Sequence, residues 1–166
     1  MEAISMFGFK KKVDILEVHA PVSGKLVALS ETKDPVFSTG AMGQGFAIEP
    51  SDDAIVSPFD GKITVIAETK HAIGMTTAEG LEVLLHLGID TVELGGKPFE
   101  VFAKVGDKVK KGQKLASMSR KDIQDKGLLT TVMVVVTNSN DKIETLEIEG
   151  KSCAVGDVIG TLKLKK

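Results

Sequence analysis

The sequence predicts an all-β domain, built as an antiparallel β-sandwich or a flattened barrel with short helical turns. Short runs rich in apolar and β-branched residues recur along the chain, and 17 glycines punctuate them. Helical periodicity is scarce by comparison. A chain of 166 residues fits a single domain. We therefore expect one domain over residues 15–166, preceded by a flexible N-terminal segment at residues 1–14.

Six runs have the composition and length of strands, and one segment favours a helix. The helical segment, residues 119–129 (SRKDIQDKGLL), is long enough for one or two turns, with a cap near Ser119. The strand runs are bounded by turn residues such as Gly, Pro and Asp. They are 25–29 (KLVAL), 45–50 (GFAIEP), 54–59 (AIVSPF), 62–69 (KITVIAET), 131–138 (TVMVVVTN) and 157–164 (DVIGTLKL).

Two segments of the chain repeat one pattern. Residues 19–29 (HAPVSGKLVAL) and 56–66 (VSPFDGKITVI) both place a Pro three residues before Gly-Lys and an alternating run. Residues 104–115 and 154–164 share a Val-Gly-Asp turn ahead of a strand. Recurring hairpin units of this kind indicate a pseudo-symmetric core of two sheets.

Composition excludes several classes of protein. The net charge of −2 and the absence of Trp and Tyr argue against a general nucleic-acid binder. The single Cys153 cannot form an internal disulfide, and we expect a reducing, cytoplasmic location. No run is long and apolar enough to span a bilayer. The N-terminal MEAISMFGFKKK suits a frayed end better than an interfacial anchor, so we expect weak or no membrane contact and a monomer.

A histidine interrupts the most apolar run of the chain, residues 81–94 (LEVLLHLGIDTVEL). A turn centred between residues 78 and 79 would place His71 opposite His86 across a hairpin. Directly opposed side chains of a hairpin have Cβ atoms about 5 Å apart and share one face. Strand alternation then groups Thr69, His71, His86 and the bare backbone of Gly88 in one patch. His19 has no evident polar partner and is interpreted as structural or exposed.

Two neighbouring imidazoles suit either of two chemistries, or none. Zinc would take His71 and His86 as ligands, with Asp90 as a third and an open position for water. Asp90 lies four residues along the strand from His86, which is too far for easy shared ligation unless the chain turns at Gly88. Alternatively, one imidazole attacks phosphorus while a hydrogen bond to its other nitrogen fixes the tautomer. The spacing alone is equally compatible with two satisfied histidines without a function.

The run at residues 84–92 resembles the signature of the glucose-type enzyme IIA family of the bacterial phosphoenolpyruvate-dependent sugar phosphotransferase system. That signature is an apolar stretch, His, a large apolar residue and Gly-Ile-Asp-Thr-Val. The resemblance extends in order through most of the chain. Its other matching segments are DPVFSTGAMGQGFAIEP (34–50), VSPFDGKI (56–63), GKPFEVFAKVGDKVKKGQKL (96–115) and VVVTN (134–138).

The resemblance implies a β-sandwich with a shallow apolar depression and assigns roles to the four grouped residues. His86 would be phosphorylated at Nε2, and His71 would contact the phosphoryl group. Thr69 would orient His71, and the Gly88 carbonyl would accept a hydrogen bond from His86. Asp34 and Asp90 match acidic positions that meet an arginine of the phosphocarrier HPr. The matching apolar docking ring comprises Val36, Phe37, Ala41, Met42, Ile73, Leu85, Leu87 and Val92.

The sequence is thus interpreted as a phosphocarrier that takes a phosphoryl group from HPr onto His86. It would pass the group to a cysteine on the IIB domain of a membrane sugar transporter, with no cofactor required. The resemblance also admits regulatory targets and a zinc ion at His71 and His86. The alternatives are a zinc-dependent hydrolase and a non-catalytic regulatory binding module. A lipoyl or biotin carrier is disfavoured because no lysine lies at a suitable hairpin tip.

Overall fold

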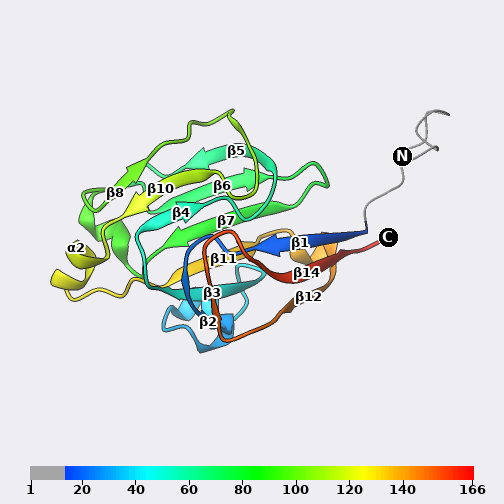
Figure 1. Cartoon of the computed structure of the whole chain (residues 1–166), viewed down its shortest axis with the longest axis horizontal. Coiled ribbons are helices and arrows are strands. Elements are labelled where there is room, and N and C mark those ends of the chain that lie inside the picture. The colour runs from blue at the N-terminus through cyan, green and yellow to red at the C-terminus, as the bar shows by residue number, and fades with distance from the viewer. Residues whose placement is uncertain (1–13) are drawn as a thin grey trace.

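The computed structural model describes residues 14–166, which fold into three antiparallel sheets (Figure 1). The largest has eight strands in the order β13-β2-β3-β11-β7-β6-β5-β9. Its edge strands, β13 and β9, do not pair with each other, so the sheet does not close into a barrel. Its strands are β2 (Gly24–Val27), β3 (Gln44–Pro50), β5 (Gly61–Ile66), β6 (Ala72–Thr76), β7 (Glu82–Leu87), β9 (Lys108–Val109), β11 (Val132–Val136) and β13 (Ser152–Cys153).

Two three-stranded sheets complete the sandwich. The first, β4-β10-β8, contains β4 (Ala54–Val56), β8 (Phe99–Val101) and β10 (Lys114–Met118). The second, β1-β14-β12, contains β1 (Ile15–His19), β12 (Ile143–Ile148) and β14 (Val158–Leu164). All six predicted runs contain a strand, and the predicted antiparallel sandwich is confirmed.

The helices are short, as the sequence predicted. Besides α2 (Arg120–Asp125), they are α1 (Pro35–Ser38), α3 (Ser139–Lys142), and the 3-10 turns η2 (Leu29–Glu31) and η3 (Thr91–Leu94). The predicted cap of α2 is confirmed, because the Ser119 side chain accepts a hydrogen bond from the Asp122 amide. Capping satisfies an amide that has no partner inside the helix.

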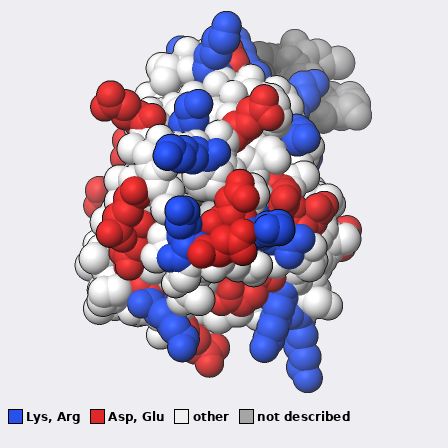
Figure 2. Space-filling model, turned by 90° about the vertical axis from the view of Figure 1, so that its left-hand side faces the viewer, with Lys and Arg blue, Asp and Glu red and all other residues white. Residues whose placement is uncertain are grey.

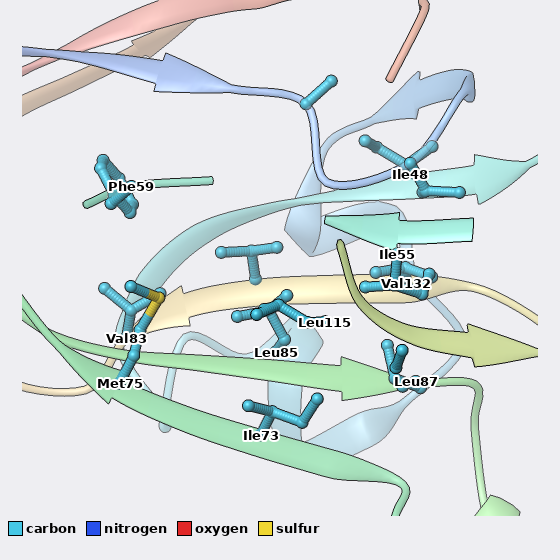
Figure 3. Close-up of a cluster of buried hydrophobic side chains, with 14 of the residues drawn as sticks. Ile48, Ile55, Phe59, Ile73, Met75, Val83, Leu85, Leu87, Leu115 and Val132 are labelled. Atoms are coloured by element: carbon cyan, nitrogen blue, oxygen red, sulfur yellow. The ribbon is translucent and has the colours of Figure 1, made fainter. Parts of the chain in front are cut away.

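The main core lies between the eight-stranded sheet and the two smaller sheets (Figure 3). Strands β6, β7 and β11 direct every second side chain toward it, among them Ile73, Leu85 and Val132. Leu115 of β10 and Ile55 of β4 meet them from the opposite sheet. This alternation buries one face of the large sheet and leaves the other face for the functional site.

The repeated segments are related by an approximate two-fold exchange. The His19 amide donates to the Pro58 carbonyl, and the Val56 amide donates to the Pro21 carbonyl. These are equivalent positions of the two repeats, so each repeat binds the other in the same way. The following strands, β2 and β5, lie next to opposite edges of the eight-stranded sheet. The two repeats thus make equivalent hydrogen bonds to each other, although the core lies among three sheets rather than the predicted two.

A second, smaller cluster lies on the other face of the large sheet. Segment 28–43, which contains η2 and α1, covers β3 and β11 there. Its apolar side chains pack on those strands, and the cluster comprises Leu29, Phe37, Ala47, Ile89, Met133 and Val135. Beside Gly74 of β6, the nearest atoms to a side chain added there would be those of Val65 and Thr64 in the neighbouring strand β5, and Val65 is exposed. The histidines lie where the covered part of the face ends.

Among residues 14–166, no helix is long and apolar enough to cross a membrane. Residues 1–13 of the predicted N-terminal segment lie outside the described residues. At the end of the molecule seen in Figure 2, acidic, basic and uncharged side chains are interspersed. That face lacks the continuous basic surface on which nucleic-acid binding depends.

Candidate functional site

His86 is held by the end of β7 and the turn that follows it. Its Nδ1 lies 2.8 Å from the Gly88 carbonyl oxygen. A carbonyl oxygen only accepts, so Nδ1 of this ring carries the proton. In the neutral ring, Nε2 then has a free lone pair. Gly88 has a φ of 80°, in the left-handed region that glycine adopts readily, and this conformation brings its carbonyl back toward the ring.

His71 lies in the bend before β6, and the predicted register of this hairpin is wrong by one residue. His86 is opposite Ala72 rather than His71, because the turn centres on Glu79. A continued strand would have directed His71 to the core face. Instead the chain turns at Lys70, whose φ is 61°, and His71 reaches the same face as His86. The predicted proximity holds, although its predicted cause does not.

The two imidazoles face each other at close range. Their ring centroids are 5.1 Å apart with an interplanar angle of 79°. The Nδ1 of His71 lies 2.7 Å from the Thr69 hydroxyl. Both hydrogen bonds that the resemblance implied are therefore present, and in each ring they engage Nδ1. The Nε2 atom of each ring is not engaged by these hydrogen bonds.

Burial lowers the pKa of both imidazoles below the ordinary value of 6.5. For His86, the hydrogen bond to Gly88 raises the pKa, the neighbouring His71 lowers it, and Asp34 and Asp90 raise it. Desolvation is the largest of these effects, and the pKa of His86 is lowered overall. Both rings are consequently neutral at pH 7, which is the state in which an imidazole is a nucleophile.

Half of the predicted docking ring is buried, and that part of the prediction is wrong. Ile73, Leu85 and Leu87 have no exposed surface, because strand alternation turns them into the main core (Figure 3). Phe37 is also buried, and its ring packs 4.9 Å from the His86 ring as a wall of the site. The accessible remainder, hereafter the apolar rim, comprises Val36, Ala41, Met42 and Val92.

The two carboxylates that were predicted to meet a partner's arginine differ in whether they already cap a helix. Asp34 is buried as the N-cap of α1, where its side chain accepts from the amides of Val36 and Phe37. Asp90 is exposed, and its carboxylate makes no capping bond to η3. Both carboxylates act electrostatically on His86. Asp90 is therefore the one that can reach a cationic partner without first breaking a cap.

Metal chemistry finds little support in this donor set. Among residues 14–166, no group of three or more His, Cys, Asp and Glu side chains could hold a metal ion. A zinc hydrolase needs three protein ligands. A cavity of about 590 Å³ elsewhere, between α1, β2, β3 and β12, includes neither histidine and no titratable side chain.

His19 is structural, as expected. Its Nδ1 bonds to the Gly156 carbonyl at 3.0 Å. Two residues that lie against the turn at Gly88 had not been identified from sequence. Leu129 is exposed, and its carbonyl accepts from the Ile89 amide. Thr91 is fully buried beneath Gly88, and its place in the Gly-Ile-Asp-Thr run was the only available signal.

The chain is similar to known proteins of one family. Residues 16–142 match the family model of the phosphoenolpyruvate-dependent sugar phosphotransferase system, EIIA 1. The chain is 48% identical over 123 residues to the PTS system beta-glucoside-specific EIIBCA component of Bacillus subtilis; the match covers 74% of this chain and 20% of that relative. The chain thus spans about a fifth of that relative's length.

Other relatives match over nearly their whole length. The chain is 38% identical over 151 residues to the PTS system glucose-specific EIIA component of Staphylococcus epidermidis, which covers 90% of each chain. The solved glucose permease IIA from Mycoplasma capricolum superposes with a TM-score of 0.83 at 35% identity, covering 93% of this chain and all of that one. The chain belongs to the EIIA 1 family of the phosphoenolpyruvate-dependent sugar phosphotransferase system.

Proposed function

We propose that this protein is a phosphohistidine carrier of the sugar phosphotransferase system. It accepts a phosphoryl group from the phosphohistidine of HPr on His86 and passes it to a cysteine on a IIB domain. The observation that carries the proposal is the hydrogen bond from His86 Nδ1 to the Gly88 carbonyl, because it leaves the lone pair on Nε2.

Uptake then proceeds by in-line displacement at phosphorus. The Nε2 lone pair of His86 forms the new P–N bond, while the P–N bond of the donor breaks and its electron pair returns to the donor imidazole. Nδ1 keeps its proton and its hydrogen bond to the Gly88 carbonyl throughout. The ring therefore becomes cationic when Nε2 is phosphorylated, and no proton has to leave. Phe37 limits access of water from one side of the ring.

In the onward transfer, the His86 imidazole is the leaving group rather than the nucleophile. A thiolate of the IIB cysteine attacks phosphorus, the P–N bond breaks, and Nε2 recovers its electron pair. In this step His71, whose ring centroid lies 5.1 Å from that of His86, would donate a hydrogen bond from Nε2 to a phosphoryl oxygen as charge shifts. The Thr69 hydroxyl holds that ring in position.

Both partners would dock on the apolar rim. Val36 of this rim precedes Phe37, whose ring packs on His86, and Val92 lies in η3, which follows the strand that carries His86. Val36 is 51% exposed on α1, and Val92 is 49% exposed on η3. Exposed aliphatic side chains beside a reactive group suit transient docking and the exclusion of water. Asp90, with its free carboxylate, would contact a basic side chain of the partner at the edge.

Intact-mass spectrometry tests the carrier function directly. The protein is mixed with phosphoenolpyruvate, enzyme I and HPr, and each component is omitted in turn. We expect one acid-labile phosphoryl group that requires HPr and is absent from His86→Ala. His19→Ala serves as a matched histidine control and keeps the addition. Absence of any addition to the folded wild-type protein contradicts the proposal.

Titration with HPr tests the docking surface. Val36→Asp introduces a charge on the apolar rim and weakens HPr binding about tenfold or more, in the range of interface residues that matter. Ile15→Asp is the control, since Ile15 is similarly exposed at 57% but lies on β1 (Figure 1). Equal weakening by both substitutions contradicts this placement of the surface.

Zinc binding and regulatory targets stay proposals of narrower scope. The fit to zinc is partial, because the two Nε2 atoms supply two ligands and the described residues supply no third. A partner carboxylate would have to complete the site. Equilibrium dialysis with zinc, with and without a partner, measures this directly, and binding lost in His71→Ala supports it.

A further inference from the structure

We propose that Thr91 is a positioning residue for His86, acting through the turn that carries the Gly88 carbonyl. This inference rests on the proposed function, and it adds a residue for which that function has no role. Thr91 has no exposed surface, and its hydroxyl donates to the Leu87 carbonyl at 2.5 Å. It makes no contact with the phosphoryl group and works only through the backbone.

The turn needs such support because one of its residues, Asp90, adopts a left-handed backbone conformation that is uncommon for residues other than glycine. Gly88 and Asp90 both have positive φ, at 80° and 61°. A Cβ on Gly88 would lie 2.5 Å from the Thr91 methyl group, so the two residues are closely packed. A non-glycine residue with positive φ, such as Asp90, persists where its surroundings hold it.

Two successive peptide groups meet at Gly88, and each is held at both ends. In the first, the Gly88 amide donates to the Thr131 carbonyl at 2.9 Å, and the Leu87 carbonyl accepts from Thr91. In the second, the Ile89 amide donates to the Leu129 carbonyl at 3.0 Å, and the Gly88 carbonyl accepts from His86. Of these four bonds, only those of His86 and Thr91 come from side chains.

A substitution at Thr91 can therefore loosen the Gly88 carbonyl, which accepts the hydrogen bond from His86, while both histidines stay unchanged. If the first peptide group tilts, the Gly88 carbonyl moves with it, and the Nδ1–H tautomer loses its advantage. The proton can then occupy Nε2, which removes the lone pair that attacks phosphorus. The hydrogen bond also raises the pKa of His86, so its weakening lowers that pKa.

Nitrogen-15 NMR of the histidine rings tests this without any phosphoryl donor. In Thr91→Val, which has the same shape without the hydroxyl, we expect the His86 nitrogens to shift toward a mixture of tautomers. The rate of phosphorylation by HPr falls roughly tenfold or more, as for other residues that orient a reactive group through a hydrogen bond. Thr91→Ser retains the hydroxyl and restores both properties.

Thr32→Val is the matched control for loss of stability. Thr32 is also buried, and its hydroxyl donates to the Leu29 carbonyl three residues earlier at 2.7 Å. It destabilises the fold by the same means and leaves the His86 tautomer unchanged. A folded Thr91→Val with wild-type ring shifts overturns the inference, and so does an equal shift in Thr32→Val. Failure of the carrier function itself appears separately, as a wild-type protein that takes up no phosphate.

Discussion

The two histidines of the site are held by the same ring nitrogen but by different kinds of partner. Nδ1 of His86 faces a backbone carbonyl, whereas Nδ1 of His71 faces the hydroxyl of Thr69. A carbonyl only accepts, so the neutral form of His86 has one tautomer. A hydroxyl accepts or donates, so His71 has two. The difference separates a ring whose Nε2 lone pair is kept free from a ring that can carry its proton on either nitrogen.

Their settings in the fold reinforce this difference. His86 belongs to a central strand, with β11 on one side and β6 on the other, and Phe37 packs on its ring. His71 lies in a bend between two strands, after a residue in the left-handed conformation. A strand fixes a side chain more tightly than a bend does. His86 is therefore held by more of its surroundings than His71 is, which suits the different roles proposed for the two rings.

The largest effect is expected from His86. His86→Ala removes the nucleophile and abolishes both phosphoryl uptake and onward transfer, while binding of unphosphorylated HPr persists because the apolar rim remains. Mass spectrometry and calorimetric titration with HPr measure the two properties. Uptake at the wild-type level in this variant contradicts the assignment of His86.

His71→Ala separates the two roles. Uptake on His86 continues, whereas transfer to the IIB cysteine falls by about 100-fold or more, in the range observed when a donor to a developing charge is removed. Rapid-quench measurements of each half-reaction distinguish the two steps. Equal loss in both steps, or no loss in either, shows that the rings do not divide the work in this way.

Thr69→Val gives a smaller loss with the same signature. Without the hydroxyl, the His71 ring loses its fixed orientation, and onward transfer falls about tenfold. Thr69→Ser keeps the hydroxyl and restores the rate. If Thr69→Ser behaves like Thr69→Val, packing by the methyl group rather than the hydrogen bond positions His71.

The smallest effect is on stability at acidic pH. Burial lowers the pKa of His86 in the folded protein, so the unfolded chain binds the proton more readily below its own value of about 6.5. The contribution of His86 to the free energy of unfolding is full above pH 6.5 and is lost as the pH falls toward the folded pKa. Urea denaturation across this range detects it. His86→Gln reduces the slope, and an unchanged slope contradicts the assignment.

The sequence by itself determined the elements and their order. Strand runs such as residues 131–138, the Ser119 cap and the repeated Pro-x-x-Gly-Lys segments are local signals, because side-chain alternation and turn chemistry act over a few residues. The motif at residues 84–92 indicated the family. These features follow from neighbouring residues alone and were predicted correctly.

Only the tertiary structure decided what depends on register and on covering segments. A shift of one residue at the turn near Glu79 pairs Ile73 with Leu85, so Ile73 belongs to the core face rather than to the face of the histidines. The bend at Lys70 returns His71 to the site, and segment 28–43 brings Phe37 onto the ring of His86. Such contacts arise between residues far apart in sequence, and no local pattern encodes them.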